Sequence, residues 1–457
     1  MKKLNMNSLA LGVALAVAST GAFAGTIAGT SAAVGVEAAT TGSLVAAGGV
    51  FEIVPAVGTN ASDRITVTLS DGATFADGSY TLFTSDGADV GNTAFTTVTN
   101  PVAGASSIVF RSASTVSTTA EYVLSSSSAI AGVGAGFTVT LPSLAAGNSV
   151  NLSASMSDLG GVYDIYPGVE IFEYANQFSG AVSDLADETI DVNTNRLTFL
   201  NDGSSDDIAL ELSDAAVANG VTLNDNDEVD FVLSGDMSGL VSVALITTET
   251  NGANAVERGE FVVADDNASA TFSASASDVF GTASSVIRAT VDGETALTTR
   301  TFTVKADLNF ETETDKNLVA EGTPAGLWNI NGLQAKVAHL TLNSSGFVSW
   351  LKVANEGTTS AQINADIIYT LADGTEGSVD NAALGTVDAG GVFTVSEASI
   401  LEAMGNPEGI VDASLTVTVA GQTNLIHLIA EKKASDGRVS LPVYYNISGA
   451  NPRNWVQ

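Results

Sequence analysis

The sequence predicts an all-β protein built from tandem β-sandwich domains of the immunoglobulin-like kind, and three observations support this prediction. Short runs alternate apolar and polar residues one by one, which is the period of a half-buried strand. Asp-Gly pairs and clusters of Asn and Asp separate these runs, as in tight turns. The chain has 457 residues, too many for one ordinary β domain, so two or three domains are expected.

The segment Val221–Gly235 shows this pattern in fifteen residues, VTLNDNDEVDFVLSG. A short apolar run ends at a cluster of Asn and Asp. Val229, Phe231 and Leu233 then alternate with polar residues. The segment therefore predicts a strand, an acidic turn and a second strand.

The charge balance is strongly acidic, with 51 Asp and Glu against 16 Lys and Arg and a net charge of −35. Such a surface repels nucleic acid and anionic lipid headgroups, attracts cations and keeps the chain soluble. The chain has no cysteine, which excludes disulfides, thiolate nucleophiles and thiolate zinc sites. Because of the negative charge, we expect no nucleic-acid partner.

The N-terminus has the three parts of a secretory signal. Lys2 and Lys3 precede an apolar core, Leu9–Ala18, and Ala22-Phe23-Ala24 forms a small-x-small cleavage site. The core is too short to span a bilayer, although an uncleaved anchor is the alternative. We predict a signal peptide over residues 1–24, cleavage after Ala24, and an extracellular protein of the cell surface without a transmembrane span in the mature chain.

Two pairs of similar segments predict an internal duplication. The first pair is SDRITVTLSDGATFADG (Ser62–Gly78) and SDDIALELSDAAVANG (Ser205–Gly220), and the second is LSASMSDLGG (Leu152–Gly161) and FSASASDVFG (Phe272–Gly281). Both pairs occur in the same order, so we predict two related β-sandwich copies over residues 25–175 and 176–310. Chance similarity in a chain rich in Ser, Ala and Asp is the alternative.

Three further segments differ in composition: the start of the first copy, the residues that follow the second copy, and the last third of the chain. Gly25–Gly49 is rich in Ala, Gly, Thr and Ser and is either a flexible leader or an exchanged edge strand. Residues 311–324 are acidic and without period, so we predict a linker. Residues 325–457 form a distinct C-terminal β domain with one short helix, capped by Ser396 or Ser399 and ended by Gly405.

Calcium is the metal ion that the acidic turns favour. Asn224, Asp225, Asp227 and Asp230 supply several side-chain oxygens within seven residues, and Ca²⁺ binds such oxygens. The spacing is not that of an EF-hand. The alternative is that these residues only form turns and keep the surface hydrated.

No segment carries a catalytic motif, and we expect a protein that is not an enzyme. The sequence contains neither G-x-S-x-G nor H-E-x-x-H. His339 and His427 are the only histidines, and His427 lies within a predicted strand, where a structural role is expected. A hydrolase that uses a pair of carboxylates is the least favoured alternative, because such pairs converge in space rather than in sequence.

The chain resembles bacterial surface-layer (S-layer) proteins. It shares with them an export signal, an acidic composition, no cysteine, abundant Ala, Thr, Ser and Val, and serial β domains. Ser62–Gly78 and DGRVSLPVYYN (Asp436–Asn446) resemble segments of uncharacterised exported proteins of Gram-negative bacteria. It lacks a clear surface-layer homology repeat, the segment with which such proteins bind cell-wall polymer.

This resemblance implies a structural subunit at the cell surface that associates with itself, and the acidic composition suggests bridging by calcium. The alternative is a secreted adhesin or carbohydrate-binding protein, with a cell-envelope glycan as partner. In that alternative Trp328, Trp350 and Trp455 could form a sugar-stacking platform, whereas packing in a core or at an interface is the favoured interpretation of these residues.

Overall fold

The structure, a computed structural model, describes residues 23–40, 44–76, 78, 80–85, 90–91, 95–97, 104–117, 120–126, 136–249, 255–421 and 424–446. The predicted signal peptide lies outside these residues apart from Phe23 and Ala24. The chain divides into two compact units, and the first ends its main segment at Phe178. The loop 214–222 and residues 312–314 also belong to the first unit.

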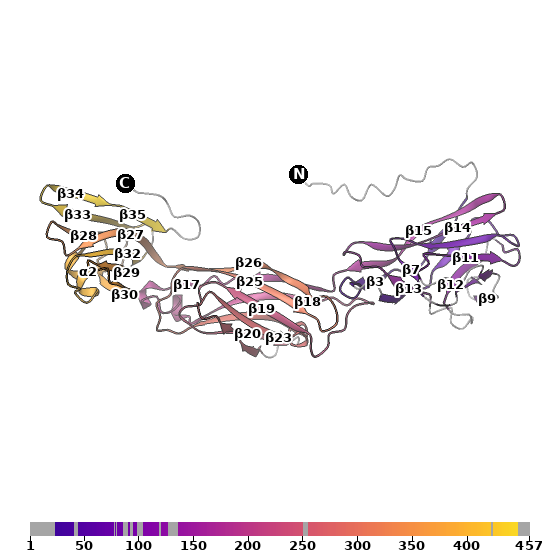
Figure 1. The fold of residues 1–457 in the computed structure, drawn as a ribbon, viewed down its shortest axis with the longest axis horizontal. Helices are drawn as coiled ribbons and strands as arrows, with labels where there is room; N and C mark the ends of the chain where they lie inside the picture. The colour runs from indigo at the N-terminus through magenta and orange to yellow at the C-terminus, as the bar shows by residue number, and fades with distance from the viewer. Residues whose placement is uncertain are drawn as a thin grey trace. The chain divides into compact units, whose positions relative to one another are not determined.

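The described strands of the first unit form three sheets, labelled in Figure 1. The first has the order β1 (Phe23–Ala24), β15 (Gly161–Ala175), β14 (Ser149–Asp158), β6 (Arg64–Leu69), β11 (Ser107–Ser112) and β10 (Phe95–Thr97), with β3 (Ala32–Gly35) also paired to β15. The second has the order β2 (Thr26–Ala28), β5 (Glu52–Val54), β12 (Glu121–Ser125), β8 (Thr81–Ser85) and β9 (Val90–Gly91). The third has the order β4 (Leu44–Ala47), β13 (Thr138–Leu141) and β7 (Thr74–Phe75).

Alternating apolar residues from all three sheets meet in one core. Val67 of β6, Ile53 of β5 and Val139 of β13 are fully buried in the same cluster. The predicted period-2 alternation is therefore confirmed, because each strand turns one face inward. The segment Gly25–Gly49 contributes β2, β3 and β4 to these sheets.

The second unit contains two sandwiches. The first has one sheet with β16 (Phe178–Asp184), β18 (Ser205–Asp214), β24 (Thr282–Val291), β20 (Leu240–Glu249) and β21 (Ala255–Glu260), and another with β17 (Thr189–Ile190), β26 (Lys316–Ile330), β25 (Arg300–Asn309), β19 (Glu228–Ser234), β23 (Ser269–Ser275) and β22 (Val262–Val263). The second has one sheet with β30 (Glu376–Val387), β29 (Ala361–Leu371), β32 (Val411–Ala420), β27 (Gly332–Leu342) and β35 (Val443–Asn446), and another with β31 (Val392–Ser396), β28 (Phe347–Asn355), β33 (Ile426–Ala434) and β34 (Gly437–Leu441). The structure thus confirms tandem β-sandwiches with a distinct C-terminal one.

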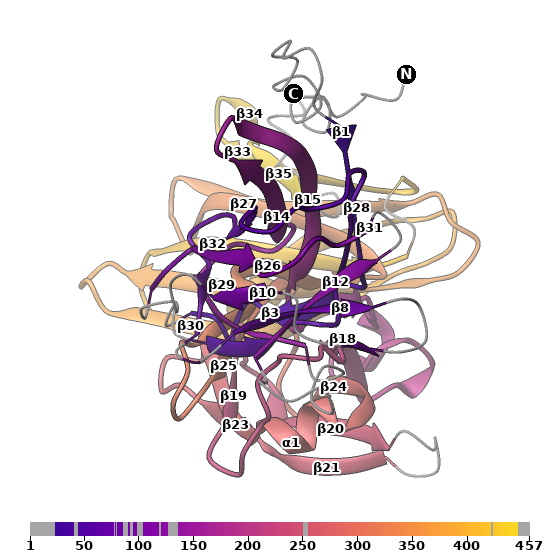
Figure 2. The same cartoon turned by 90° about the vertical axis from the view of Figure 1, so that its right-hand side faces the viewer.

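Helices are short in the described part of the chain. The predicted helix of the C-terminal domain is confirmed as α2 (Glu397–Ala403), in which the Ser396 side chain accepts the backbone N–H of Ser399. A second helix, α1 (Ala276–Phe280), lies against β23 and β24 (Figure 2). Two 3₁₀ turns, η3 (Val192–Thr194) and η4 (Leu200–Asp202), precede β18. None of the described helices has the length and apolar character needed to cross a membrane.

The two pairs of similar segments do not occupy equivalent places in the sheets. In the first unit β6 and β14 are neighbours in one sheet, with Leu69 opposite Leu152. The corresponding strands of the second unit, β18 and β23, lie in the two different sheets of a sandwich. The duplication therefore does not extend to strand order. The shared pattern specifies an alternating strand that ends in a turn, but it does not specify which strand becomes the neighbour.

The predicted linker over residues 311–324 is wrong for most of its length. Lys316–Ile330 forms β26, which pairs with β25 from Lys316 opposite Leu308 to Trp328 opposite Arg300. Three register shifts interrupt this pairing, and Gly322 has a φ of 78°. These irregularities remove the period-2 pattern from the sequence, so a long irregular strand was mistaken for a linker.

Candidate interaction surfaces

The predicted calcium residues lie at the turn before β19, where Asp227 has a structural role. The Asp227 carboxylate is completely buried, and it accepts the backbone N–H of Asn224 (2.8 Å) and of Glu311 (2.9 Å) on its two oxygens. Asp225 is exposed in the same turn. Asp230 lies in β19, where it accepts hydrogen bonds from the Ser273 hydroxyl and from Asn309 Nδ2.

The turn therefore does not present the four predicted side chains as a shared oxygen cage. Asp227 faces the protein interior, and Asp230 is bonded to neighbouring strands. Throughout the part of the chain that the structure describes, no three Asp, Glu or His residues lie together in a way that could hold a metal ion. The site at Asn224–Asp230 stays a prediction.

Replacing Asp227 with Ala should lower the free energy of unfolding by about 2–3 kcal/mol, because two backbone N–H groups lose their charged acceptor. Asp225→Ala is the matched control, and at this exposed position we expect a change within about 0.5 kcal/mol. Urea unfolding of both variants measures the difference. Equal losses would contradict the structural role of Asp227.

The tryptophans do not form one platform. Trp328 is completely buried and packs against Phe199 and Phe302, with ring centres 4.7 and 4.9 Å away. Trp350 is half-buried in β28, and Trp455 lies outside the described residues. The interpretation of Trp328 as a sugar-stacking residue is therefore wrong, since its ring belongs to a core.

A hollow of about 340 Å³ on the sheet of β27, β29 and β32 contains one of the two histidines. His339 Nε2 lies 4.0 Å from Asp412 Oδ1, and the Thr341 hydroxyl donates to the same oxygen at 2.8 Å. The His339 side chain is 69% exposed. The Thr341 hydroxyl also lies 3.3 Å from His339 Nε2. Because its hydrogen is donated to Asp412 Oδ1, it is not held for transfer to the histidine, as the proton of an activated nucleophile would be.

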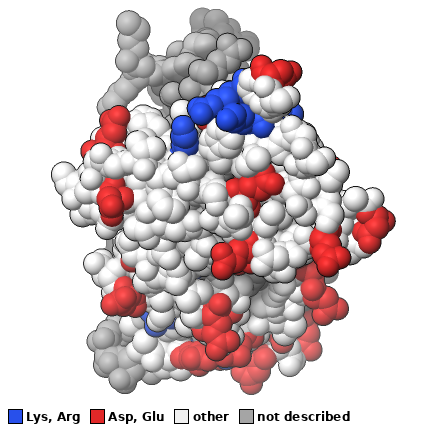
Figure 3. All heavy atoms as spheres, turned by 90° about the vertical axis from the view of Figure 1, so that its left-hand side faces the viewer, with Lys and Arg blue, Asp and Glu red and all other residues white. Residues whose placement is uncertain are grey.

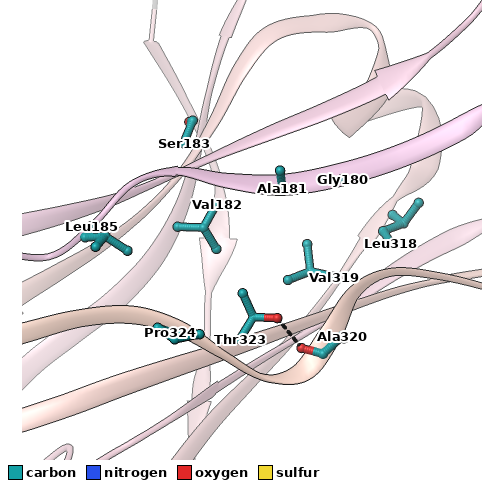
Figure 4. A pocket seen from close by; sticks show the side chains of 10 residues that line it. All are labelled: Gly180, Ala181, Val182, Ser183, Leu185, Leu318, Val319, Ala320, Thr323 and Pro324. Atoms are coloured by element: carbon teal, nitrogen blue, oxygen red, sulfur yellow. Dashed lines mark hydrogen bonds between the residues drawn. The ribbon is translucent and has the colours of Figure 1, made fainter. Parts of the chain in front are cut away.

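A second hollow, of about 630 Å³, lies between β16 and β26 (Figure 4). Figure 4 shows Val182 on one strand and Val319 on the other, with the Thr323 hydroxyl donating to the Ala320 carbonyl at 2.7 Å. The strand β26 is irregular here, with register shifts in its pairing with β25 and a φ of 78° at Gly322. None of the lining residues is acidic, basic or aromatic, so this hollow offers contact area without acid-base chemistry.

The outer face of β28, β33 and β34 concentrates positive charge. We call it the cationic face, and its residues are Trp350, Lys352, Ile429, Glu431, Lys433 and Arg438. The alternating burial of β28 places Leu351 and Val353 in the core and the neighbouring residues outside. In Figure 3, Lys and Arg side chains gather near one edge of the surface, whereas Asp and Glu are dispersed.

Strand register brings the members of the cationic face together. Trp350 lies opposite Glu431, and Lys433 lies opposite Arg438. The Arg438 guanidinium is 5.5 Å from the centre of the Trp350 ring, which suits a cation–π contact. Directly opposite side chains on one face of a sheet are about 5 Å apart, so these groups form one surface.

The only carboxylate of the cationic face is already engaged. Glu431 Oε2 accepts the indole N–H of Trp350 at 2.9 Å and lies 3.8 Å from Lys352 Nζ. Lys433 and Arg438 make no ion pair with any described residue. The cationic face therefore presents unneutralised positive charge beside an aromatic ring and the half-exposed side chain of Ile429.

Comparison with known protein families decides the class of the protein. The family model described as S-layer protein Slr4 matches residues 63–447. The chain belongs to this S-layer family. The match extends from the first sandwich to the end of the described C-terminal domain, so the Slr4-family chain is a structural protein of the cell surface rather than a member of an enzyme family.

Solved structures similar to this Slr4-family chain include cell-surface proteins. The Enterococcus faecalis MSCRAMM ACE, which binds its ligands by the collagen hug model, is 11% identical with a TM-score of 0.21, and the match covers 68% of this chain and 96% of that one. The collagen adhesin CNA of *S. aureus* is 8% identical with a TM-score of 0.19 and covers 65% and 95%. The BSP domain of a biofilm-associated protein is 11% identical with a TM-score of 0.20 and covers 94% and 82%. A search among curated proteins found no match.

Sequence reasoning missed the cationic face of the Slr4-family chain. The segment EKKASDGR, which contains Lys432, Lys433 and Arg438, was a visible signal, because basic residues are scarce elsewhere. Trp350 and Lys352 lie about eighty residues earlier, and only the register of β28 with β33 brings them to the same face. A charge-cluster scan could have found half of this surface.

Proposed function

We propose that the protein is a self-associating subunit of a surface layer, in which the cationic face of one copy contacts an acidic surface of the next. The observation that carries the proposal is the gathering of Lys352, Lys433 and Arg438 on one sheet face of a chain whose net charge is −35. Membership of the S-layer family supports self-association as the purpose of such a face.

Charge screening explains how chains of like net charge can associate. At low salt the Debye length is about 30 Å, and the whole negative surface of one copy repels the next. At about 0.15 M it falls to about 8 Å, so only the groups in contact matter. A cationic face against carboxylates is then locally attractive. Trp350 and Arg438 are also of the residue types that contribute most to protein interfaces.

Reversing the charge of the cationic face should weaken self-association at least ~10-fold, equivalent to about 1.4 kcal/mol. The variant is Lys433→Glu with Arg438→Glu, which places like charges opposite each other across the contact. The matched control, Arg64→Glu with Lys336→Glu, changes the net charge equally at two other exposed strand positions. Sedimentation velocity over a protein concentration series measures the constants, and electron microscopy shows any lattice.

The two variants give distinct outcomes. Loss of association in the cationic-face variant alone supports the proposal. Equal loss in both variants would mean that net charge, not this face, controls association. A wild-type protein that stays monomeric at all concentrations and salt levels would contradict self-association itself, and binding of a cell-envelope glycan to the same face would then be the function to pursue.

Zero-length carbodiimide cross-linking identifies the partner surface. In a mixture of ¹⁴N- and ¹⁵N-labelled protein, we expect Lys433 to be joined to an Asp or Glu peptide of a differently labelled copy. Cross-links only to its own neighbours, such as Glu431, would contradict a contact between copies.

Calcium enters the proposal as a bridge between acidic surfaces of adjacent copies, since several carboxylate oxygens are the ligands it prefers. At constant ionic strength, about 1 mM Ca²⁺, a level typical of extracellular calcium sites, should increase association and chelator should reverse it. The thermal midpoint of the monomer reports separately on a bound ion at Asn224–Asp230. If calcium changes neither the self-association nor the thermal midpoint of the monomer, the proposed role of calcium is wrong.

A further inference from the structure

The first unit contains a buried carboxylate without a cationic partner among the described side chains. Asp164 in β15 is completely buried. Its Oδ1 accepts the backbone N–H of Gly25 at 2.9 Å, and its Oδ2 accepts that of Ala56 at 3.0 Å. No described Lys, Arg or His makes an ion pair with it. A buried carboxylate is costly unless a positive charge and hydrogen bonds compensate it.

The backbone nitrogen of Gly25, which donates to Asp164 Oδ1, is the atom that signal cleavage would change from an amide to an amine. The sequence predicts cleavage between Ala24 and Gly25, because Ala22-Phe23-Ala24 is a small-x-small site. We infer that the α-ammonium group of Gly25, created by this cleavage, is the ionic partner of Asp164. The inference rests on the predicted cleavage position and is independent of the proposed self-association.

The chemical step is hydrolysis by a signal peptidase. The bond between the Ala24 carbonyl carbon and the Gly25 nitrogen breaks, water supplies the hydroxyl group of the new Ala24 carboxyl, and the nitrogen becomes an amine. An α-amino group has a pKa of about 7.7–8.0 and is mostly protonated at neutral pH. The neutral amide that donates to Asp164 in the precursor is thus replaced, at the same nitrogen, by a cation.

The surroundings of Gly25 accept only glycine. A Cβ built on Gly25 would lie 2.2 Å from Tyr166 Cε1 and 2.7 Å from the Val54 carbonyl oxygen. The Tyr166 hydroxyl, whose pKa is raised by burial and then by the nearby Asp164 carboxylate, points to Met156 with its oxygen 2.6 Å from the sulfur. The close packing around Gly25 therefore requires glycine as the first residue after the predicted cleavage site.

The new N-terminus would connect two sheets of the first unit. Gly25 immediately precedes β2, in which Thr26 pairs with Val54 of β5. Asp164 belongs to β15, in the sheet that also contains β14 and β6. In the uncleaved chain Phe23 and Ala24 pair alongside Asp164 and Ile165 as β1, and cleavage removes this strand. An ion pair between Gly25 and Asp164 would replace it as the link between β15 and the start of β2.

Amine labelling of the mature full-length protein tests the inference directly. Mass spectrometry first establishes the N-terminal residue, which should be Gly25. In the folded protein an amine-reactive reagent at neutral pH should modify the Gly25 amine at least ~10-fold more slowly than the exposed Lys336 side chain, and in denaturant the protection should vanish. A different N-terminal residue, or rapid labelling in the folded state, would overturn the inference.

A double-mutant cycle shows whether protection reflects an ion pair rather than burial alone. Insertion of one Ala before Gly25 restores an amide at its nitrogen and moves the ammonium away. In the wild-type background this insertion should lower the melting temperature of the first unit by roughly 5 °C or more. In the Asp164→Asn background the insertion should add little. Equal effects in both backgrounds would overturn the inference, and the labelling result decides the matter should the Asp164→Asn chain fail to fold.

Discussion

Replacing Arg196 with Ala should lower the free energy of unfolding of the second unit by about 3–5 kcal/mol, the usual loss when one partner of a buried ion pair is removed. Arg196 Nη1 and Nη2 lie 3.0 and 2.5 Å from the two oxygens of Asp366 in β29. The Arg196 side chain is 2% exposed, and that of Asp366 is 27% exposed. Truncation of the arginine leaves a half-buried carboxylate without its cation.

The Arg196–Asp366 ion pair connects the loop around η3 to the C-terminal sandwich. Asp366 Oδ1 also accepts the backbone N–H of Asn381 at 2.8 Å, and Asn381 Nδ2 donates to the Asn195 carbonyl at 2.8 Å. On the other side of the loop, Asn331 Nδ2 donates to Asp191 Oδ1 at 2.7 Å. Loss of Arg196 should therefore weaken the connection between the two sandwiches as well as the local turn.

The second unit supplies a control with the same bonding pattern in a different environment. Arg288 Nε and Nη2 lie 2.7 and 2.8 Å from the two oxygens of Asp207, but these side chains are 43% and 44% exposed. Arg288→Ala should cost only about 0–1 kcal/mol. Urea unfolding, followed by the fluorescence of Trp328 and Trp350 in this unit, compares the variants. Similar losses would show that burial does not control the strength of the Arg196–Asp366 pair.

The sequence predicted faces and turns well because these depend on neighbouring residues. The alternation of Val229, Phe231 and Leu233 correctly identified the buried side of β19, and Ser396, one of the two serines expected to cap the helix, is the residue at which α2 begins. Strand neighbours could not be predicted in this way. A period of two fixes which side chains point inward, but pairing depends on loops and on contacts far apart in the chain.

The candidate sites show the same limit. Asn224, Asp225 and Asp227 were correctly located at a turn, but the sequence could not show that Asp227 points inward to the backbone N–H of Glu311, more than eighty residues away. Arg196 lies in a segment without any motif, and its partner Asp366 is 170 residues further along the chain. Interactions that join distant strands leave no local pattern.

Replacing Trp328 with Ala should cost about 3–5 kcal/mol, because a completely buried indole leaves a cavity between Phe199 and Phe302. Trp328 also donates its indole N–H to Asp206 Oδ2 at 2.7 Å, and the Arg300 guanidinium lies 5.3 Å from the ring centre. Trp350→Phe is a comparison at a half-buried indole that also donates to a carboxylate, and its loss should be smaller. A Trp328→Ala variant as stable as the wild type would contradict the role of Trp328 in stabilising the core.

The substitution Trp328→Phe removes the hydrogen bond to Asp206 but keeps an aromatic ring. The resulting loss of stability should depend on pH. Burial raises the pKa of the Asp206 carboxyl above its usual value of 3.8, while the indole N–H and backbone N–H groups lower it. Removing the indole N–H should raise this pKa further. A carboxyl with a raised pKa binds its proton more tightly in the folded state, so stability falls as pH rises through the folded pKa.

The cost of Trp328→Phe should therefore be smallest in acid, at pH values below the folded pKa of Asp206, and should increase as the pH rises through that pKa. Above that range the cost should be constant, because the carboxylate is ionised and lacks one donor at every higher pH. Urea unfolding between acid and neutral pH measures this curve. A cost that is independent of pH would mean that only packing is lost, and a cost that is larger in acid would reverse the sign expected for a buried carboxylate.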